Sequence, residues 1–251
     1  MRRPLPCAFH FINPVFMGVL IAFAEAILSR ASGRAEIAAQ NISNLTTPGY
    51  KSRASFQALL TASPANVRTP DAVGSKIDWS PGKIVQTHNP LDLAISGDGF
   101  FAVRSGDKLF YTRNGQFQRD ADGHLVTADG MVLQATTGDA SVPAGVPAIA
   151  PDGTIREDGK DAGQIVVVDF KDKSGLVAMG NGCFAAPTNA AHAIDTPRVV
   201  QGAVEQSNAS DATEMLSMMA SLRSAETGQH IVQLYDDLMA QAATGFGQGQ
   251  S

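Results

Sequence analysis

The sequence predicts an α+β protein, in which N- and C-terminal helices pair as a coiled-coil-like terminal domain and short antiparallel strands and hairpins form a central β-rich domain. Apolar residues at helical spacing lie near both ends, turn-forming dipeptides fill the middle, and asparagine-rich segments separate the parts. The expected parts are a helical segment over 17–51, an extended connector over 52–76, a β-rich domain over 77–203, a second helical segment over 204–244 and a flexible tail over 245–251.

Residues 1–16 are interpreted as a dispensable leader or a mis-assigned start. The alternative is a cleavable secretory signal, because Arg2 and Arg3 precede an apolar stretch that ends in small residues at Ala24. Cleavage there would remove the apolar start of the first helix, and Met17 stands where that helix is expected to begin. The apolar stretch is too short to span a bilayer, so no stable membrane insertion is expected.

The first helix is expected from about Gly18 to Leu45. Its apolar positions are Leu20, Phe23, Ile27, Ile37, Ala38, Ile42 and Leu45. The segment 41–51 should end the helix, because Thr47 precedes a proline and Pro48-Gly49 forces a turn. Serine, alanine, threonine and proline then dominate the connector, where Pro64 and Pro70 interrupt any regular element.

Hairpin turns are expected in the middle of the chain, at the Asp-Gly pairs that begin at 98, 122, 129, 152 and 158 and at the Asn-Gly pairs that begin at 114 and 181. The clearest strands are Leu91 to Ile95, Phe100 to Arg104, Leu109 to Thr112, His124 to Thr127, Met131 to Gln134 and Gln164 to Phe170. Alternation predicts that Leu91, Leu93 and Ile95 share one face and that Asp92 and Ala94 share the other. The apolar run 165–168 predicts a strand buried on both faces.

The last helix is expected from about Ala212 to Ala243. Ser207, Asn208, Ser210 or Asp211 could each cap it, and Glu205 would add favourable charge near its N-terminus. Two displaced seams, resembling a stutter, are expected on this helix: Met215, Met218, Met219, Leu222 and Ala225, then Ile231, Leu234, Tyr235, Leu238 and Ala242. Leu216, Met219 and Val232 should be partly exposed in a monomer, unless they fold back on the β-rich domain.

Composition and motifs give no indication of catalysis, a cofactor or nucleic-acid binding. The formal charge of -5 and the absence of a basic cluster disfavour nucleic acid. Cys7 and Cys183 are interpreted as free thiols, and the five histidines are scattered, so no metal site is expected. The segments 97–99 and 120–123 are interpreted as turns rather than a dinucleotide loop and a calcium loop. No Gly-x-Ser-x-Gly elbow is present.

Four blocks occur in the order found in bacterial flagellar rod and hook proteins. The first, Ala39 to Lys51, is similar to the family motif ANNIANVNTPGYK, and the others lie at 90–101, at 111–127 and at 202–208. The chain therefore resembles the flagellar basal-body rod family. Within it, the short connection between Tyr50 and Ser80 is most like proximal rod proteins and next most like distal rod proteins.

The resemblance implies a non-catalytic subunit of the periplasmic rod, exported by the flagellar type III apparatus. Its expected partners are further copies and neighbouring proximal and distal rod subunits. A distal rod or hook-type subunit is the alternative within the family, and a secreted β-rich carbohydrate-binding or hydrolytic domain is the alternative from another class.

The chain departs from the family pattern at Arg223-Ser224-Ala225-Glu226, where an aromatic residue is usual. Gly228 follows in the helix interior, at a cost of about 1 kcal/mol relative to alanine. Packing over 225–229 is therefore expected to be weak, and Gly228→Ala is expected to stabilise the assembled form.

The residues expected to serve structure or assembly come from these blocks and from the last helix. Asn41, Asn44 and Asn208 are expected either to bond between subunits or to cap helix ends. The full set is Asn41, Ile42, Asn44, Leu45, Pro48, Gly49, Tyr50, Gly97, Gly99, Phe100, Tyr111, Arg113, Gly115, Glu205, Ser207, Asn208, Met215, Met218, Met219, Leu222, Ile231 and Leu238.

Overall fold

The computed structural model describes residues 14–56, 74–142, 147–157, 160–187 and 190–247. The chain divides into two compact units, which are described separately. Unit 1 contains residues 1–39, 55–75 and 212–251, and unit 2 contains residues 40–54 and 76–211. The predicted leader (1–16) and tail (245–251) lie mostly outside the described residues, as does most of the connector.

The predicted α+β class is confirmed. Two helices, α1 (Pro14–Ser43) and α2 (Asp211–Gly247), flank a middle region of antiparallel strands. None of the described helices has an apolar stretch long enough to cross a membrane.

Helix α1 buries a stripe of small residues. Ala24, Ala31 and Ala38 are almost fully buried and lie seven residues apart, which places them on one face of the helix. Half-buried Ile27 and Leu28 lie between the first two alanines, whereas Phe23, which was predicted to belong to the apolar face, is 58% exposed. Small buried side chains allow another backbone to come close.

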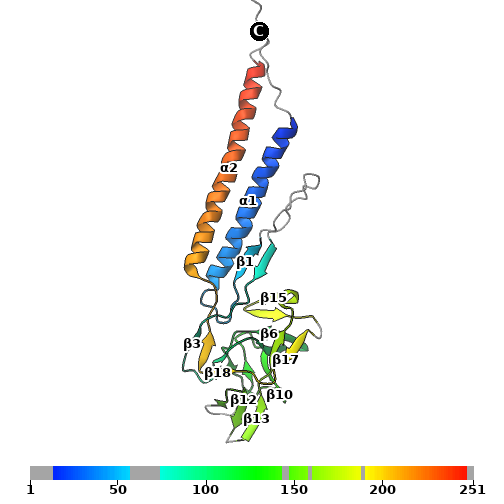
Figure 1. Ribbon diagram of the computed structural model, residues 1–251, viewed down its shortest axis with the longest axis vertical. Coiled ribbons are helices and arrows are strands. Elements are labelled where there is room, and N and C mark those ends of the chain that lie inside the picture. The colour runs from blue at the N-terminus through cyan, green and yellow to red at the C-terminus, as the bar shows by residue number, and fades with distance from the viewer. Residues whose placement is uncertain (1–13, 57–73, 143–146, 158–159, 188–189, 248–251) are drawn as a thin grey trace, which may run out of the picture. The chain divides into compact units, whose positions relative to one another are not determined.

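Helix α2 lies beside α1 and runs antiparallel to it, as Figure 1 shows. Its buried stripe is also built from small residues, because Ser221 and Gly228 are buried seven residues apart. The half-buried positions around them are Glu214, Ser217, Met218, Ser224, Ala225, Ile231, Val232 and Tyr235. The stripe continues from 214 to 235 without a shift.

The two predicted seams of α2 are therefore wrong. Met215, Met219, Leu222, Leu234 and Leu238 are about half or more exposed. The separate prediction that Leu216, Met219 and Val232 are partly exposed is confirmed, although Val232 is half-buried. Of the predicted seam residues, Met218, Ala225, Ile231 and Tyr235 do lie on the buried stripe, and the side chain of Ala242 is outside the described set. The large apolar residues suggested the seams, but small residues occupy the positions closest to α1.

Gly228 has a packing reason to be glycine. An added Cβ would lie 2.9 Å from Cγ of Leu28 and 3.3 Å from Cγ2 of Ile27. The expected weak packing over 225–229 is therefore wrong at this position, where α2 contacts α1.

We expect Gly228→Ala to destabilise the helix pair, opposite to the prediction from sequence alone. The gain in helix propensity, about 1 kcal/mol, is outweighed by overpacking that costs about 1–3 kcal/mol. Urea unfolding followed by far-UV circular dichroism measures the change. Gly18→Ala is the matched control, because an added Cβ there has no neighbour within 4 Å. Equal stabilisation by both substitutions would contradict the packing account.

The middle of the chain consists of short strands (Figure 1). They are β1 (Arg53–Phe56), β2 (Gly74–Ile77), β3 (Ile84–Gln86), β4 (Leu93–Ile95), β5 (Phe100–Ser105), β6 (Lys108–Thr112), β7 (Gln118–Arg119), β8 (Leu125–Val126), β9 (Val132–Ala135), β10 (Gly138–Asp139), β11 (Ala148–Ile149), β12 (Thr154–Glu157), β13 (Lys160–Gln164), β14 (Val167–Phe170), β15 (Val177–Gly180), β16 (Cys183–Ala185), β17 (Ala191–Ala193), β18 (Val199–Gln201) and β19 (Ala203–Glu205). A short 3₁₀ helix, Lys173–Gly175, lies between β14 and β15.

Ten of the described strands form one sheet, with the order β15-β16-β6-β5-β9-β8-β7. In addition, β10 pairs with β9, and β14 pairs with both β5 and β17. Separate two-stranded pairings join β19 to β3 and β18 to β4, so the segment that leads into α2 lies against the start of the β-rich region.

Strand β5 separates two hydrophobic cores. Phe101 and Val103 belong to the larger core, whereas Phe100 and Ala102 belong to the smaller one. This division follows from strand geometry, because successive side chains point to opposite faces. Trp79 covers the smaller core, with its ring 5.0 Å from Phe184 and 5.7 Å from Phe100, both edge to face.

One strand prediction is confirmed and the bounds of another need correction. Leu93 and Ile95 share a core and Leu91 packs against it, as predicted, and Asp92 and Ala94, predicted on the other face, are buried as well. The predicted strand Gln164 to Phe170 is divided between β13 and β14. Its apolar run is buried on both faces as predicted, since Ile165 and Val167 enter the larger core and Val166 and Val168 the smaller.

Candidate functional site

Three of the sequence blocks converge on one buried carboxylate in unit 2. Oε1 of Glu205 lies 2.6 Å from Nζ of Lys51, and Oε2 lies 3.0 Å from an Nη of Arg113. All three side chains are at most 4% exposed. We call Lys51, Arg113 and Glu205 the Glu205 junction.

Backbone groups complete the bonding around this carboxylate. The Gly82 N–H donates to Oε1 of Glu205 (2.8 Å), and the Gly49 N–H donates to the Glu205 carbonyl (2.7 Å). Lys51 also donates to the Ser80 carbonyl (2.7 Å). The predicted role of Glu205, a generic charge near the start of the last helix, is therefore wrong, because its charge is taken up by two buried cations.

Arg113 connects the junction to the loop after β4. Its guanidinium donates to the Gly97 carbonyl (2.7 Å) and to the Ile95 carbonyl (3.4 Å), and it lies 5.4 Å from the centre of the Phe100 ring. Arg113 directly precedes the Asn-Gly pair that was predicted to form a turn, but its side chain serves a long-range contact, as one half of a buried ion pair.

Burial lowers the pKa of the Lys51 ammonium, and the nearby charge of Arg113 lowers it further, whereas the bond and charge of Glu205 act in the opposite direction. The junction also buries two cations with only one carboxylate. Such a cluster is costly to desolvate, so its three members depend strongly on each other.

Asn41 holds the chain that returns from α1. Its Oδ1 accepts from the Arg53 N–H (2.9 Å) and from the Tyr50 hydroxyl (3.1 Å), and its Nδ2 donates to the Arg53 carbonyl (2.7 Å). The fully buried amide therefore bonds to the Arg53 backbone as a neighbouring strand would. Asn44 acts at the helix end, where its Nδ2 donates to the Gln40 carbonyl (2.8 Å).

Asn208 joins two segments that precede and follow the connector. Its Oδ1 accepts from the Ser52 N–H (2.7 Å), and its Nδ2 donates to the carbonyls of Asp78 (2.9 Å) and Ser80 (3.0 Å). These bonds occupy the amide away from the first turn of α2, so the capping interpretation is wrong for Asn208. Ser207 bonds locally, with its Oγ accepting from the Ala209 N–H.

Three glycines, two in the sequence blocks and one at position 82, allow backbones to come into close contact. An added Cβ would lie 2.2 Å from the Arg113 carbonyl carbon at Gly49, 1.9 Å from the Gln206 oxygen at Gly82 and 1.6 Å from the Leu93 oxygen at Gly115. The Asn-Gly pair at 114 was predicted to form a hairpin turn, but β6 pairs with β5 and β16 rather than with β7, and Gly115 is not among the residues with positive φ. Its missing side chain serves close packing instead.

The remaining predicted residues lie in the β-rich region, around the end of α1 and on α2. Phe100 and Tyr111 lie in the smaller core, and Gly97 and Gly99 form a turn with φ of 115° and 122°. Ile42, Leu45 and Pro48 are half-buried around the end of α1. The predicted residues of α2 all lie on that helix, in unit 1; they are Met215, Met218, Met219, Leu222, Ile231 and Leu238.

Lys51 and Gly82 both bond to the Glu205 carboxylate, and the predicted set missed them. Lys51 ends the first sequence block, but its position gave no indication of which distant residue it contacts. A charged residue inside an otherwise apolar or turn-forming block was the available signal, and it applies to Lys51, Arg113 and Glu205 alike.

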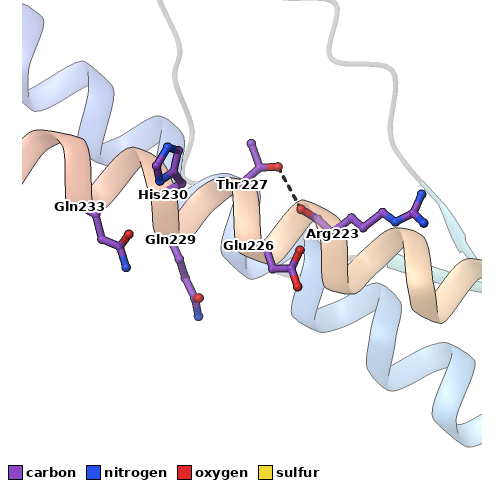
Figure 2. A pocket seen from close by; sticks show the side chains of 6 residues that line it. All are labelled: Arg223, Glu226, Thr227, Gln229, His230 and Gln233. Atoms are coloured by element: carbon purple, nitrogen blue, oxygen red, sulfur yellow. Dashed lines mark hydrogen bonds between the residues drawn. The ribbon is translucent and has the colours of Figure 1, made fainter.

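Two further groups of polar side chains occur among the described residues. Figure 2 shows a surface hollow along α2, lined by Arg223, Glu226, Thr227, Gln229, His230 and Gln233, whose side chains leave the helix in different directions. Within this hollow, the Thr227 hydroxyl donates a hydrogen bond to the Arg223 carbonyl one turn earlier (2.9 Å).

The second grouping brings Asp120, Asp122 and His124 together, with possible ligand atoms within 4.8 Å of one another. Oδ1 of Asp120 accepts from the N–H groups of Asp122 (3.0 Å) and His124 (2.7 Å). These bonds are those of a side chain that stabilises its own turn. Cys183 is a free, buried thiol, and Cys7 lies outside the described residues.

Comparison with known proteins identifies relatives over most of the chain. Residues 94–160 match the family described as flagellar hook protein FlgE/F/G D1 domain. The flagellar basal-body rod protein FlgF of Escherichia coli (strain K12) is 31% identical over 85% of this chain and 92% of its own length. FlgG of Agrobacterium fabrum (strain C58) is 27% identical, over 87% of this chain and 95% of the relative. Relatives of both rod types thus align over similar shares, and they do not distinguish FlgF from FlgG.

Proposed function

The chain belongs to the family of flagellar basal-body rod proteins, as a structural axial subunit of the basal body, and from this premise we propose that it assembles through its terminal helices. The matched family and relatives are structural flagellar proteins, so the alternative of a secreted carbohydrate-binding or hydrolytic domain is set aside. The partners in this assembly are further copies and neighbouring rod subunits.

The exposed apolar face of α2 carries this proposal. Leu216 is 68% exposed, Met219 57%, Leu222 53% and Met215 52%. A cluster of large apolar side chains on one surface marks a site of protein association. Methionine side chains are flexible and adapt to non-identical neighbours, as a rod of several related subunits requires.

The other face of each helix supports pairing within the subunit. Buried residues recur at seven-residue spacing in both helices, at Ala24, Ala31 and Ala38 in α1 and at Ser221 and Gly228 in α2. This spacing is the one a coiled-coil-like pair uses. Each helix therefore has one side for its partner in the same chain and a second side for neighbouring subunits. A repeated contact of this kind that does not close on itself builds a helical tube.

Within the rod, we assign the subunit to the proximal part, exported through the flagellar type III apparatus to the periplasm. Support comes from the sequence, in which the connection between Tyr50 and Ser80 is short. The position of the protein in isolated basal bodies distinguishes the proximal from the distal assignment.

A deletion strain tests the proposed function. We expect the strain to lose swimming motility and intact rods, and a plasmid copy of the wild-type gene to restore both. Normal motility and intact basal bodies in the deletion strain, with no related gene substituting, would refute the rod assignment.

A further inference from the structure

The Glu205 junction connects parts of the chain that are far apart in sequence. Lys51 and Glu205 are 154 positions apart, and Arg113 and Glu205 are 92 apart. Lys51 follows the turn after α1, Glu205 precedes α2, and the Ser80 carbonyl bound by Lys51 belongs to the segment that follows the connector. One carboxylate thus contacts the chain near the ends of both terminal helices.

Backbone and side-chain bonds together hold the segment around Ser80 in unit 2. At its two ends, the Asp78 N–H donates to the Ser52 carbonyl (2.8 Å) and the Gln206 N–H donates to the Lys83 carbonyl (2.8 Å). Residues 78–83 lie outside the strands, and Lys51, Asn208 and Glu205 supply side-chain bonds to its backbone at Asp78, Ser80 and Gly82. Trp79 anchors the same segment through the smaller core. Loss of the junction charges would therefore remove or weaken the bonds in the middle of this segment, at Ser80 and Gly82, while the ten-stranded sheet keeps its own bonds.

We propose that the Glu205 junction is a latch: it fixes residues 49–53, 78–83 and 205–208 to one another, so that the end of α1 and the start of α2 take their places only when all three segments are together. The latch rests on the proposed assembly through the helices, because it determines whether they are presented for that assembly. A buried carboxylate with two cations suits this role. It contributes little net stability when complete, but the loss of one member leaves unpaired buried charge.

Hydrogen exchange of the purified full-length chain tests the latch without depending on assembly. In Glu205→Gln we expect amides in 49–53, 78–83 and 205–208 to exchange at least about tenfold faster, whereas amides in β5 and β6 keep their protection. Asp139→Asn is the control. The Asp139 carboxylate forms an ion pair with the Arg104 guanidinium at 2.6 Å, and both side chains are partly exposed. This variant should leave all three segments protected.

Acrylamide quenching gives a second readout, since Trp79 is the chain's single tryptophan and lies in the latched segment. Lys51→Met is expected to destabilise the protein less and is used if Glu205→Gln fails to fold. The Arg113–Glu205 ion pair that remains in this variant has no net charge. We expect it to increase the quenching of Trp79 while the sheet stays protected. Unchanged exchange and quenching in a folded variant, or equal loss throughout the sheet in Lys51→Met, would overturn the latch.

A double variant tests whether Lys51 and Glu205 protect the three segments as a pair or independently of each other. If Lys51 and Glu205 act as a pair, the combined Lys51→Met and Glu205→Gln chain should lose less protection than the sum of the single losses. Additive losses would contradict the latch. Failure of the rod assignment gives a different result, namely that the wild-type chain is absent from basal bodies although its three segments are protected.

Discussion

Replacing Gly115 by alanine is expected to lower the free energy of unfolding of unit 2 by about 3 kcal/mol or more. The added Cβ would lie 1.6 Å from the Leu93 carbonyl oxygen and 2.7 Å from the carbonyl carbon. Both atoms belong to backbone, which no side-chain rotation can move away. The same strand is held by a bond from the Leu93 N–H to the Gly115 carbonyl (2.9 Å), so the two segments cannot separate without losing it.

Chemical unfolding followed by Trp79 fluorescence measures this effect, with Gly175→Ala as the matched control. Gly175 also lacks a positive φ, and an added Cβ there would meet only the Pro187 ring, at 3.4 Å. The control is expected to change stability by no more than about 0.5 kcal/mol. Similar stabilities for the two variants would show that the close approach of Gly115 to Leu93 is not present in solution.

Phe101→Ala is the second substitution with a large expected effect, a loss of about 3–5 kcal/mol. Phe101 is fully buried in the larger core, where its ring packs edge to face on Phe117 at 5.5 Å. Its removal leaves a cavity that the surrounding strands fill only in part. Leu109→Ala, at a position that is 51% exposed, serves as the control and should cost far less.

The neighbouring Phe100→Ala variant tests the division into two cores. Phe100 contacts Trp79, whereas Phe101 belongs to the other core. We expect the native fluorescence of Trp79 to change in Phe100→Ala and to stay unchanged in folded Phe101→Ala. The opposite result would contradict the placement of the two rings.

The sequence was sufficient to predict the parts of the fold that local patterns determine. Both helices, the short strands between them and the strand buried on both faces follow from periodicity and from turn dipeptides. Local patterns did not predict which face of each helix or strand packs against which other part of the chain. Met215 and Leu222 look like core residues in a helical repeat, but Ser221 and Gly228 occupy the buried stripe because only small residues let α2 approach α1 so closely.

The Glu205 junction was hidden for a similar reason. A glutamate before a helix has a sufficient local explanation in the helix dipole, and nothing near Glu205 in the sequence points to Lys51 or Arg113. Gly115 likewise has a sufficient explanation as half of an Asn-Gly turn. In both cases a long-range contact, rather than local propensity, determines the role of the residue.

The most direct test of the account is the accessibility of the apolar face of α2 before and after assembly. A Met219→Cys chain, with Cys7 and Cys183 replaced by serine, can be labelled with a maleimide as purified monomer and in isolated basal bodies. Basal bodies dissociated in detergent serve as the control for the reactivity of the introduced thiol. We expect rapid labelling in the monomer, at least about tenfold slower labelling in intact basal bodies and full labelling after dissociation. Equal labelling of monomer and intact basal bodies would contradict assembly through this face of α2.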